Sequence, residues 1–349
     1  MSDRLRIFGI LVVAIAIAPR MTSACAVPVF RYALDRWAPD AYRLEASATT
    51  LRNGSAGADL RGDNGARLNI LALPQPDESG NRAVLRFPSE TGDNSEAWSG
   101  ELTAETYRQL TESPARAQIA HRLLSGDSAV WILVESGNRD ADERVAKLLA
   151  EQIAIAEKMP LPTTRPNDPE SQIAPGPKMQ VKFSLLRVSR NAPHETFFLT
   201  SLAGPGGLAT LSKEEPFAAV VFGRGRVLGA WSPAKLTPEL ITQASRFILG
   251  ACSCEAKHLN PGWDLLMRVN WDAELEKAAA ANPRPNGDST TRPVAAETVT
   301  YQPATAAPTQ PLPDYSSFAL MMGIVPVFFV IGGSILAVGV AYLLVRRRV

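Results

Sequence analysis

AVWILV, the stretch at residues 129–134, is an uninterrupted apolar run of strand length. A strand with this pattern is typically buried on both faces, in a sheet that lies between layers of helices. Helix signals flank it on either side. Ser113 and Pro114 form an N-cap and first-turn pair upstream, and Asp140 with Glu143 predicts a capping box downstream. The centre of the chain is therefore expected to be α/β.

A second series of strand and helix patterns follows further along the chain. Residues 181–188 have the pattern of a strand, and residues 216–222 form another apolar, buried strand. A Gly-Arg-Gly turn leads into residues 226–231, which we expect to pair back as a hairpin. A helix that begins after Thr237 and ends before Gly250 completes this unit.

The order and spacing of these elements resemble the C-terminal half of the thioredoxin fold, over about residues 181–250. In that family a proline opens a strand, a Phe-x-x-Gly turn joins it to the next strand, and a last helix packs back. Pro216, Phe222 and Gly225 occupy these places. The resemblance implies a thioredoxin-like domain in which Pro216 is the cis-proline beside the active site.

Proline content divides the chain into two expected domains. Residues 158–180 are rich in proline and predict a linker. On either side of it we expect an α/β domain at 27–157 and the thioredoxin-like α/β domain at 181–275. A chain of 349 residues is long enough for two modest domains of this kind.

The first of these domains has weaker local signals. Pro28 suits the first turn of a short helix, and residues 42–46 alternate in polarity as a strand does. Residues 68–73 and 83–87 are expected to be short strands within a turn-rich region. A helix followed by a strand again favours α/β packing.

The C-terminal end predicts a membrane anchor. Residues 318–345 carry no charge, and a helix needs roughly 20 apolar residues to cross a bilayer. Three arginines follow at once, which places the tail in the cytoplasm by the positive-inside rule. We therefore expect a transmembrane helix with a cytoplasmic tail at 316–349, joined to the body by a disordered stalk at 276–315.

The N-terminus predicts that the body is exported. Residues 1–26 combine two early arginines, a short apolar run and small residues for cleavage, which is typical of a signal peptide. We expect a single-pass membrane protein with an extracytoplasmic body. Two alternatives stay open: Cys25 could be lipidated, and residues 312–316 (LPDYS) could open a cell-surface sorting signal whose tail is removed.

Composition and motifs exclude several classes of function. The formal net charge is +1 and the basic residues are scattered, so nucleic acid is not an expected partner. The three histidines form no HExxH pattern, and the phosphate-loop and GxSxG motifs are missing. We expect no cofactor, and the sequence favours a protein that is not an enzyme.

Thiols are the residues with possible chemistry. Cys252 and Cys254 can form a strained, reducible disulfide or bind a soft metal. Cys25 would be a third thiol, and His258 a further metal ligand. The alternative in an exported protein is a structural disulfide from Cys25 to one of the pair, or buried thiols. The Cys-x-x-Cys of thioredoxins is missing, because Pro28 occupies the place of a second cysteine after Cys25.

Residues 24–37, 252–254 and 260–267 also resemble an uncharacterised family of exported bacterial single-pass membrane proteins, which implies no activity. We interpret the chain as a membrane-anchored extracytoplasmic binding or assembly component of a membrane complex. Its expected partners are the membrane and other membrane or envelope proteins. The alternative is a thiol-disulfide or soft-metal-handling protein.

Overall fold

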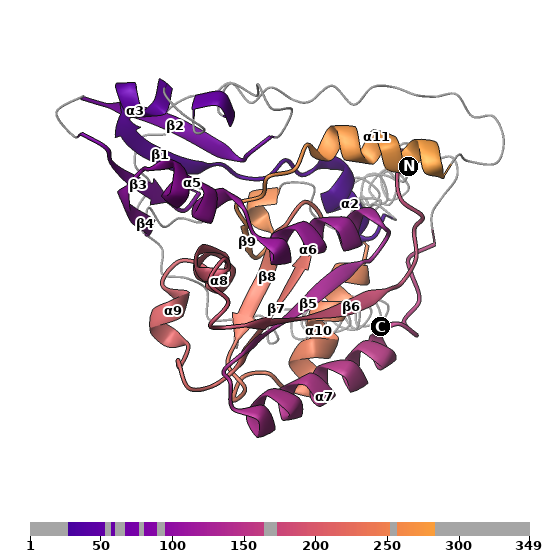
Figure 1. Ribbon diagram of the computed structural model, residues 1–349. Coiled ribbons are helices and arrows are strands. Elements are labelled where there is room, and N and C mark those ends of the chain that lie inside the picture. The colour runs from indigo at the N-terminus through magenta and orange to yellow at the C-terminus, as the bar shows by residue number, and fades with distance from the viewer. Residues whose placement is uncertain are drawn as a thin grey trace, which may run out of the picture. The chain divides into compact units, whose positions relative to one another are not determined.

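The computed structural model describes residues 27–52, 57–59, 67–76, 80–88, 95–163, 173–251 and 257–282 (Figure 1). Within them the chain forms helices and two mixed β-sheets, which confirms the expected α/β class. The elements in chain order are α2 (Val29–Arg36), β1 (Tyr42–Ser47), α3 (Ala48–Arg52), β2 (Ile70–Gln75), β3 (Arg82–Arg86), β4 (Glu96–Glu101), α5 (Ala104–Thr111), α6 (Pro114–Leu124), β5 (Ala129–Glu135), α7 (Arg139–Ala156), β6 (Phe183–Ser189), α8 (Thr196–Ala203), α9 (Gly207–Thr210), β7 (Phe217–Phe222), β8 (Arg226–Trp231), α10 (Pro238–Leu249), the 3-10 turn η4 (Lys257–Leu259), β9 (Trp263–Asp264) and α11 (Trp271–Ala281).

The larger sheet has five strands in the order β6-β5-β7-β8-β9. β5 pairs in parallel with β6 and antiparallel with β7, and β7 forms a hairpin with β8. Residues 129–134 of β5 are all buried, so the strand expected there is confirmed. The hairpin turn needs glycine, because Gly223 and Gly225 have φ values of 59° and 95°.

Helices cover both faces of this sheet (Figure 1). α2, α7 and α10 pack on one face, in a core that contains Trp131 and Val220. α6, α8 and α11 pack on the other, in a core that contains Ile132 and Val221. Neighbouring residues of one strand point to opposite faces, so β5 and β7 contribute to both cores.

The expected boundary between two domains runs through this sheet. β5 lies in the first expected domain (27–157) and β6 to β9 lie in the second (181–275), yet β5 pairs with both β6 and β7. The two sides therefore share one sheet and its cores. The segment at 158–180 was expected to be a linker, yet four of its apolar side chains pack against the core around Trp131. These are Met159, Leu161, Ile173 and Met179.

The smaller sheet has four strands in the order β2-β1-β3-β4. β1 pairs in parallel with β2 and antiparallel with β3, and β3 with β4 antiparallel. Tyr42, Leu44 and Ala46 of β1 are buried in a third core, together with Phe197 and Leu266. The residues between them lie on the opposite face and are half-buried. This sheet is therefore buried mainly on one face.

Several local predictions are confirmed by this structure. The strands expected at 42–46, 68–73 and 83–87 correspond to β1, β2 and β3. Ser113 and Thr237 cap α6 and α10, because each side-chain oxygen accepts a hydrogen bond from the N–H three residues later.

The capping box predicted at Asp140 and Glu143 is wrong. α7 begins at Arg139, and its N-cap is Asn138, whose side-chain oxygen accepts the Ala141 N–H at 3.2 Å. The helix starts two residues earlier than the box requires, because an Asn side chain can supply the capping acceptor as well.

The ends of the chain are described only in part. α11 is capped by Asn270 and runs to Ala281, so helix occupies the first residues of the stalk expected at 276–315. Alanine has the highest helix propensity, which explains why this alanine-rich end continues the helix. No helix among the described residues is both long and apolar enough to cross a membrane. The segments at 1–26 and 318–345 lie outside the described residues.

Candidate functional site

The thiol and metal candidates can be placed only in part. Cys25, Cys252 and Cys254 lie outside the described residues. His258 lies on η4, where it is exposed. Across the described part of the chain, no group of three or more His, Cys, Asp or Glu side chains could hold a metal ion.

The described residues beside these cysteines are paired with each other. Pro28 and Ala251 form an antiparallel β-bridge, and the Val29 N–H donates to the Gly250 carbonyl oxygen at 2.9 Å. In the sequence, Pro28 lies a few residues after Cys25, and Ala251 directly precedes Cys252. The fold therefore places the described ends of these two segments side by side.

Pro216 lies directly before β7, as expected, but it is not a cis-proline. The described residues contain no cis peptide bond, and the trans form is the more stable one for most X–Pro bonds. The Glu215 carbonyl oxygen accepts a hydrogen bond from Arg190 at 2.6 Å, and the Arg190 guanidinium lies 5.5 Å from the centre of the Phe217 ring. The start of β7 is thus held by structural contacts.

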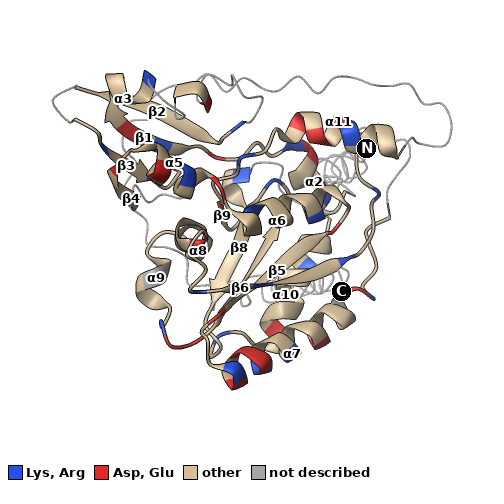
Figure 2. Ribbon diagram, viewed as in Figure 1, with Lys and Arg blue, Asp and Glu red and all other residues tan. Residues whose placement is uncertain are grey.

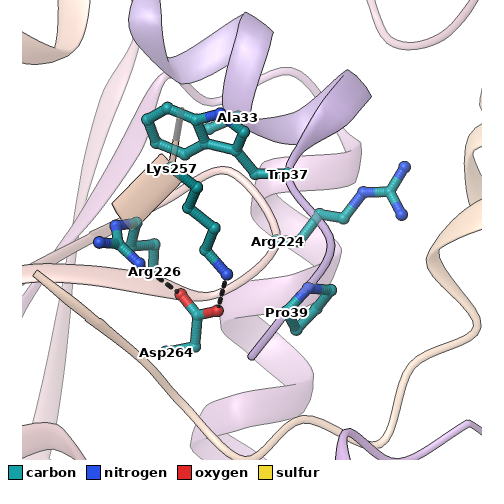
Figure 3. Close-up of a pocket in the computed structure, with 7 residues that line it drawn as sticks. All are labelled: Ala33, Trp37, Pro39, Arg224, Arg226, Lys257 and Asp264. Atoms are coloured by element: carbon teal, nitrogen blue, oxygen red, sulfur yellow. Dashed lines mark hydrogen bonds and ion pairs between the residues drawn. The ribbon is translucent and has the colours of Figure 1, made fainter. Parts of the chain in front are cut away.

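Four charged side chains converge where the two sheets meet; we call them the ionic cluster. Asp40 lies between α2 and β1, Arg226 begins β8, Lys257 begins η4, and Asp264 ends β9. Figure 3 shows Arg226 and Lys257 directed at the Asp264 carboxylate. Asp264 is 1% exposed and Arg226 is 5% exposed, so both charges are removed from water.

Asp264 is the centre of the ionic cluster. One of its carboxylate oxygens accepts from the Lys257 ammonium and, at 2.5 Å, from the backbone N–H of Asp40. The other accepts from Arg226 at 3.3 Å. The Lys257 ammonium also lies 2.8 Å from the Asp40 carboxylate. One ammonium group therefore bridges two carboxylates, which is the pairing that a buried charge requires.

The surroundings of Asp40 in the ionic cluster raise the pKa of its carboxyl group. Burial raises the pKa of Asp40 to about 6, since desolvation penalises its charged form. The Asp264 carboxylate raises the pKa further by repulsion, while Lys257 and Arg226 oppose the shift. The charge of the cluster therefore depends on pH in a physiologically relevant range.

A small hollow lies beside the ionic cluster (Figure 3). Arg224 donates to two backbone carbonyl oxygens of α2, and Arg226 donates to those of Asn260 and Pro261. Because these donors already have acceptors within the protein, the arrangement is suited to holding chain segments together. The hollow is lined by Ala33, Trp37, Pro39, Arg224, Arg226, Lys257 and Asp264.

Sequence reasoning did not identify the ionic cluster. Asp264 lies between Trp263 and Leu265, and a charge inside an apolar segment can indicate burial beside a partner. Its partners Asp40 and Arg226 are far away in sequence, and no motif links the three positions. Only the pairing of the strands brings them together.

The turn between β5 and α7 is closed by a buried carboxylate. Asp142, in the first turn of α7, is 4% exposed. Its oxygens accept the Ser136 N–H and hydroxyl at 2.9 Å each, and the Gly137 N–H at 3.0 Å. The polar groups of this turn are therefore satisfied from within the protein.

A buried arginine lies between the two sheets. Arg116 of α6 is 4% exposed and donates to the carbonyl oxygens of Leu110 and Leu266 at 2.6 and 2.5 Å. Burial lowers the pKa of Arg116 to about 10. Glu195, also buried, accepts the Ala115 N–H at 2.8 Å at the start of the same helix. These contacts join α5, α6 and α8 to the segment after β9.

No protein-family model matches this chain, and no similar protein was found among curated proteins or solved structures. Its residues and their geometry are therefore the basis on which a function is assigned.

Proposed function

We propose that this protein is an exported, membrane-anchored binding or assembly component, and that its body contains a thioredoxin-like core without the thiol chemistry of that family. The apolar segment at 318–345 is the anchor, and the signal peptide at 1–26 directs the body across the membrane. The partners are other membrane or envelope proteins.

The arrangement of the larger sheet supports a thioredoxin-like core. β5, α7 and β6 form a parallel βαβ unit, which is followed by the β7–β8 hairpin and α10. α7 and α10 pack on one face of the sheet and α8 packs on the other. We therefore include β5 and α7 in the proposed thioredoxin-like core, together with about residues 181–250.

The β5–α7 turn carries the proposal that this core binds partners rather than exchanging disulfides. The C-x-x-C of a thioredoxin-like protein lies near such a βαβ unit, and a helix N-terminus acidifies a thiol there. Here the turn has the sequence SGNR at residues 136–139. The Asp142 carboxylate accepts the hydrogen bonds of Ser136 and Gly137. This turn holds no thiol that could attack a disulfide.

The charged surface is compatible with a protein partner. Figure 2 shows acidic and basic residues side by side along α7 and α11. Mixed charges of this kind favour binding to another protein surface that carries complementary charges.

The anchor and orientation are tested with the full chain carrying a tag after Val349, in intact cells. We expect the protein in the membrane fraction, a tag that external antibody does not reach, and a body that external protease digests. A tag that is accessible from outside, or recovery of the chain in the soluble fraction, would contradict the proposal.

Partner binding is tested by cross-linking the full chain in its membrane, followed by detergent extraction and mass spectrometry. We expect the same envelope protein to be cross-linked to wild type and to a variant with Cys25, Cys252 and Cys254 replaced by Ser. The matched control is an unrelated membrane protein that carries the same tag and is taken from the same membrane fraction. Loss of the cross-link in the cysteine variant alone would favour a thiol function.

The β-bridge between Pro28 and Ala251 favours a second candidate, in which residues 1–26 stay attached and Cys25 works with Cys252 or Cys254 in thiol-disulfide or soft-metal chemistry. Free thiols are counted on the folded full chain, with and without mild reductant. A disulfide that resists mild reductant is structural and agrees with a binding component. A disulfide that is readily reduced, or thiols that bind a soft metal, would support the second candidate.

A further inference from the structure

The ionic cluster lies at the connection between the two sheets. Asp40 belongs to the segment that leads from α2 on the larger sheet into β1 of the smaller one. The Asn69 side chain donates to the carbonyl oxygens of Asp40 and Leu265, at 2.8 and 3.0 Å. The Tyr42 hydroxyl donates to the Asp264 carbonyl oxygen at 3.0 Å. The ionic cluster and these hydrogen bonds therefore lie together at the connection between the sheets.

The ionic cluster ties the turn that contains Lys257 to the body. Lys257 donates to the Ala38 carbonyl oxygen at 2.6 Å and contacts the Asp40 carboxylate. Arg226 holds the other end of the turn through the carbonyl oxygens of Asn260 and Pro261. Within the turn, His258 and Leu259 are exposed, and Leu259 retains 68% of its accessible surface. The turn is short and exposes these two side chains to water, which is typical of a segment that can open locally.

We propose that the ionic cluster is a pH-sensitive latch, in which Asp40 holds the turn at residues 257–261 more tightly in mild acid than at neutral pH. The latch would act in the same way with or without the membrane anchor and the binding role proposed above.

The charges around Asp40 determine the direction of the effect. Asp264 faces it from β9, Lys257 from η4 and Arg226 from β8. The neighbouring Arg224 is paired with Asp272 at 3.0 Å. When Asp40 is ionised, two carboxylates share Lys257 and Arg226 in a buried site, and the desolvation cost of the second carboxylate is not fully offset. Protonation of Asp40 removes that cost and leaves Asp264 with both cations.

Proton linkage gives the size of the change. In the latched state Asp40 has a pKa of about 6, and in an opened, hydrated state it returns to the ordinary value of 3.8. A raised pKa in the closed state means that closure is most favourable below the ordinary value and is weakened as pH rises through about 6. Between pH 5 and pH 7.5 the two values predict about a tenfold increase in the population of the open state.

The test is amide hydrogen exchange of the full chain at several pH values, corrected for the intrinsic exchange rate. We expect opening of residues 257–264 to increase about tenfold from pH 5 to pH 7.5, while the amides of β5 stay protected. Asp40→Asn mimics the protonated carboxyl, so this variant should stay closed and show no pH dependence. His258→Gln is the matched control, because it removes the imidazole of the turn and should keep the tenfold change.

Wild-type exchange that does not vary with pH would overturn the proposal. A pH dependence that persists in Asp40→Asn would also overturn it, because another group would then be titrating. So would a pH dependence that disappears in His258→Gln, because that group would then be the imidazole. If Asp40→Asn does not fold, the carboxyl carbon of wild-type Asp40 is titrated by NMR. An inflection near pH 6 that coincides with opening supports the latch, and an inflection near pH 4 overturns it.

Discussion

The two sheets of this protein are buried in different ways. In the larger sheet, β5 and β7 are covered by helices on both faces, and all six residues of β7 are buried. In the smaller sheet, β1 buries Tyr42, Leu44 and Ala46 and leaves the residues between them half-buried. Because stabilisation by the hydrophobic effect follows the apolar area removed from water, the larger sheet should be the more stable of the two.

The largest expected effect is at Trp131, at the centre of β5. Trp131 is fully buried and its ring lies 5.9 Å from that of Trp231. Trp131→Ala leaves a large cavity in a sheet covered on both faces, and should lower the free energy of unfolding by about 4 kcal/mol. Denaturant titration of the full chain measures this loss.

Trp131→Phe is the matched control for cavity size. The Trp131 ring N–H has no hydrogen-bond partner among the described residues, so phenylalanine removes that unpaired group while keeping most of the ring. We expect it to cost much less than the alanine variant. Equal losses in both variants would show that the ring volume is not what stabilises this sheet.

The difference between the sheets also explains why their strands have sequence signals of different strength. Burial of β5 on both faces leaves a continuous apolar run, which is visible in a single sequence. β4, with the sequence EAWSGE, is half-buried along most of its length and has no such pattern, and it was not expected. The strand pairing across residues 158–180 was not visible for a related reason, since the composition of this segment gives no sign that β5 pairs with β6.

The next effect is expected in the smaller sheet, at Leu44. This side chain is 1% exposed in the core that β1 shares with Phe197. Leu44→Ala should cost about 3 kcal/mol, and it should speed amide exchange in β1 and β3 while β5 stays protected. Leu71, 50% exposed on β2 of the same sheet, is the control, and Leu71→Ala should change stability by less than about 0.5 kcal/mol. Equal acceleration of exchange in both sheets would show that they unfold as one unit.

A smaller loss is expected at Arg116, which connects the two regions. Arg116→Met keeps much of the side-chain volume but leaves the carbonyl oxygens of Leu110 and Leu266 without their donor. We expect a loss of about 2 kcal/mol, offset in part because a buried charge is removed. Stability is measured at pH 7, and Arg116→Lys is the control that retains the charge. A gain in stability with methionine would show that the desolvation cost of the arginine exceeds the value of its hydrogen bonds.

The site residues, like the strands, differ in how far they could be predicted from the sequence. The caps at Ser113 and Thr237 were predictable because each depends on residues within one turn of the helix. The ionic cluster was not, because Asp40, Arg226 and Asp264 meet only after both sheets have formed. Pro216 shows the limit of a resemblance: its place before β7 was predicted correctly, but its cis peptide bond was not.

The smallest expected effect distinguishes the predicted from the observed start of α7. Asn138→Ala removes the acceptor for the Ala141 N–H and should cost about 1 kcal/mol, the usual value of an N-cap. Asp140→Ala should cost less, because the helix has already begun at Arg139 and this side chain is not the cap. Both variants are compared with wild type by thermal unfolding, and amide exchange at residues 139–142 locates the change. A larger loss of stability for Asp140→Ala than for Asn138→Ala would support the predicted capping box. The N-cap of α7 would then be Asp140 and not Asn138.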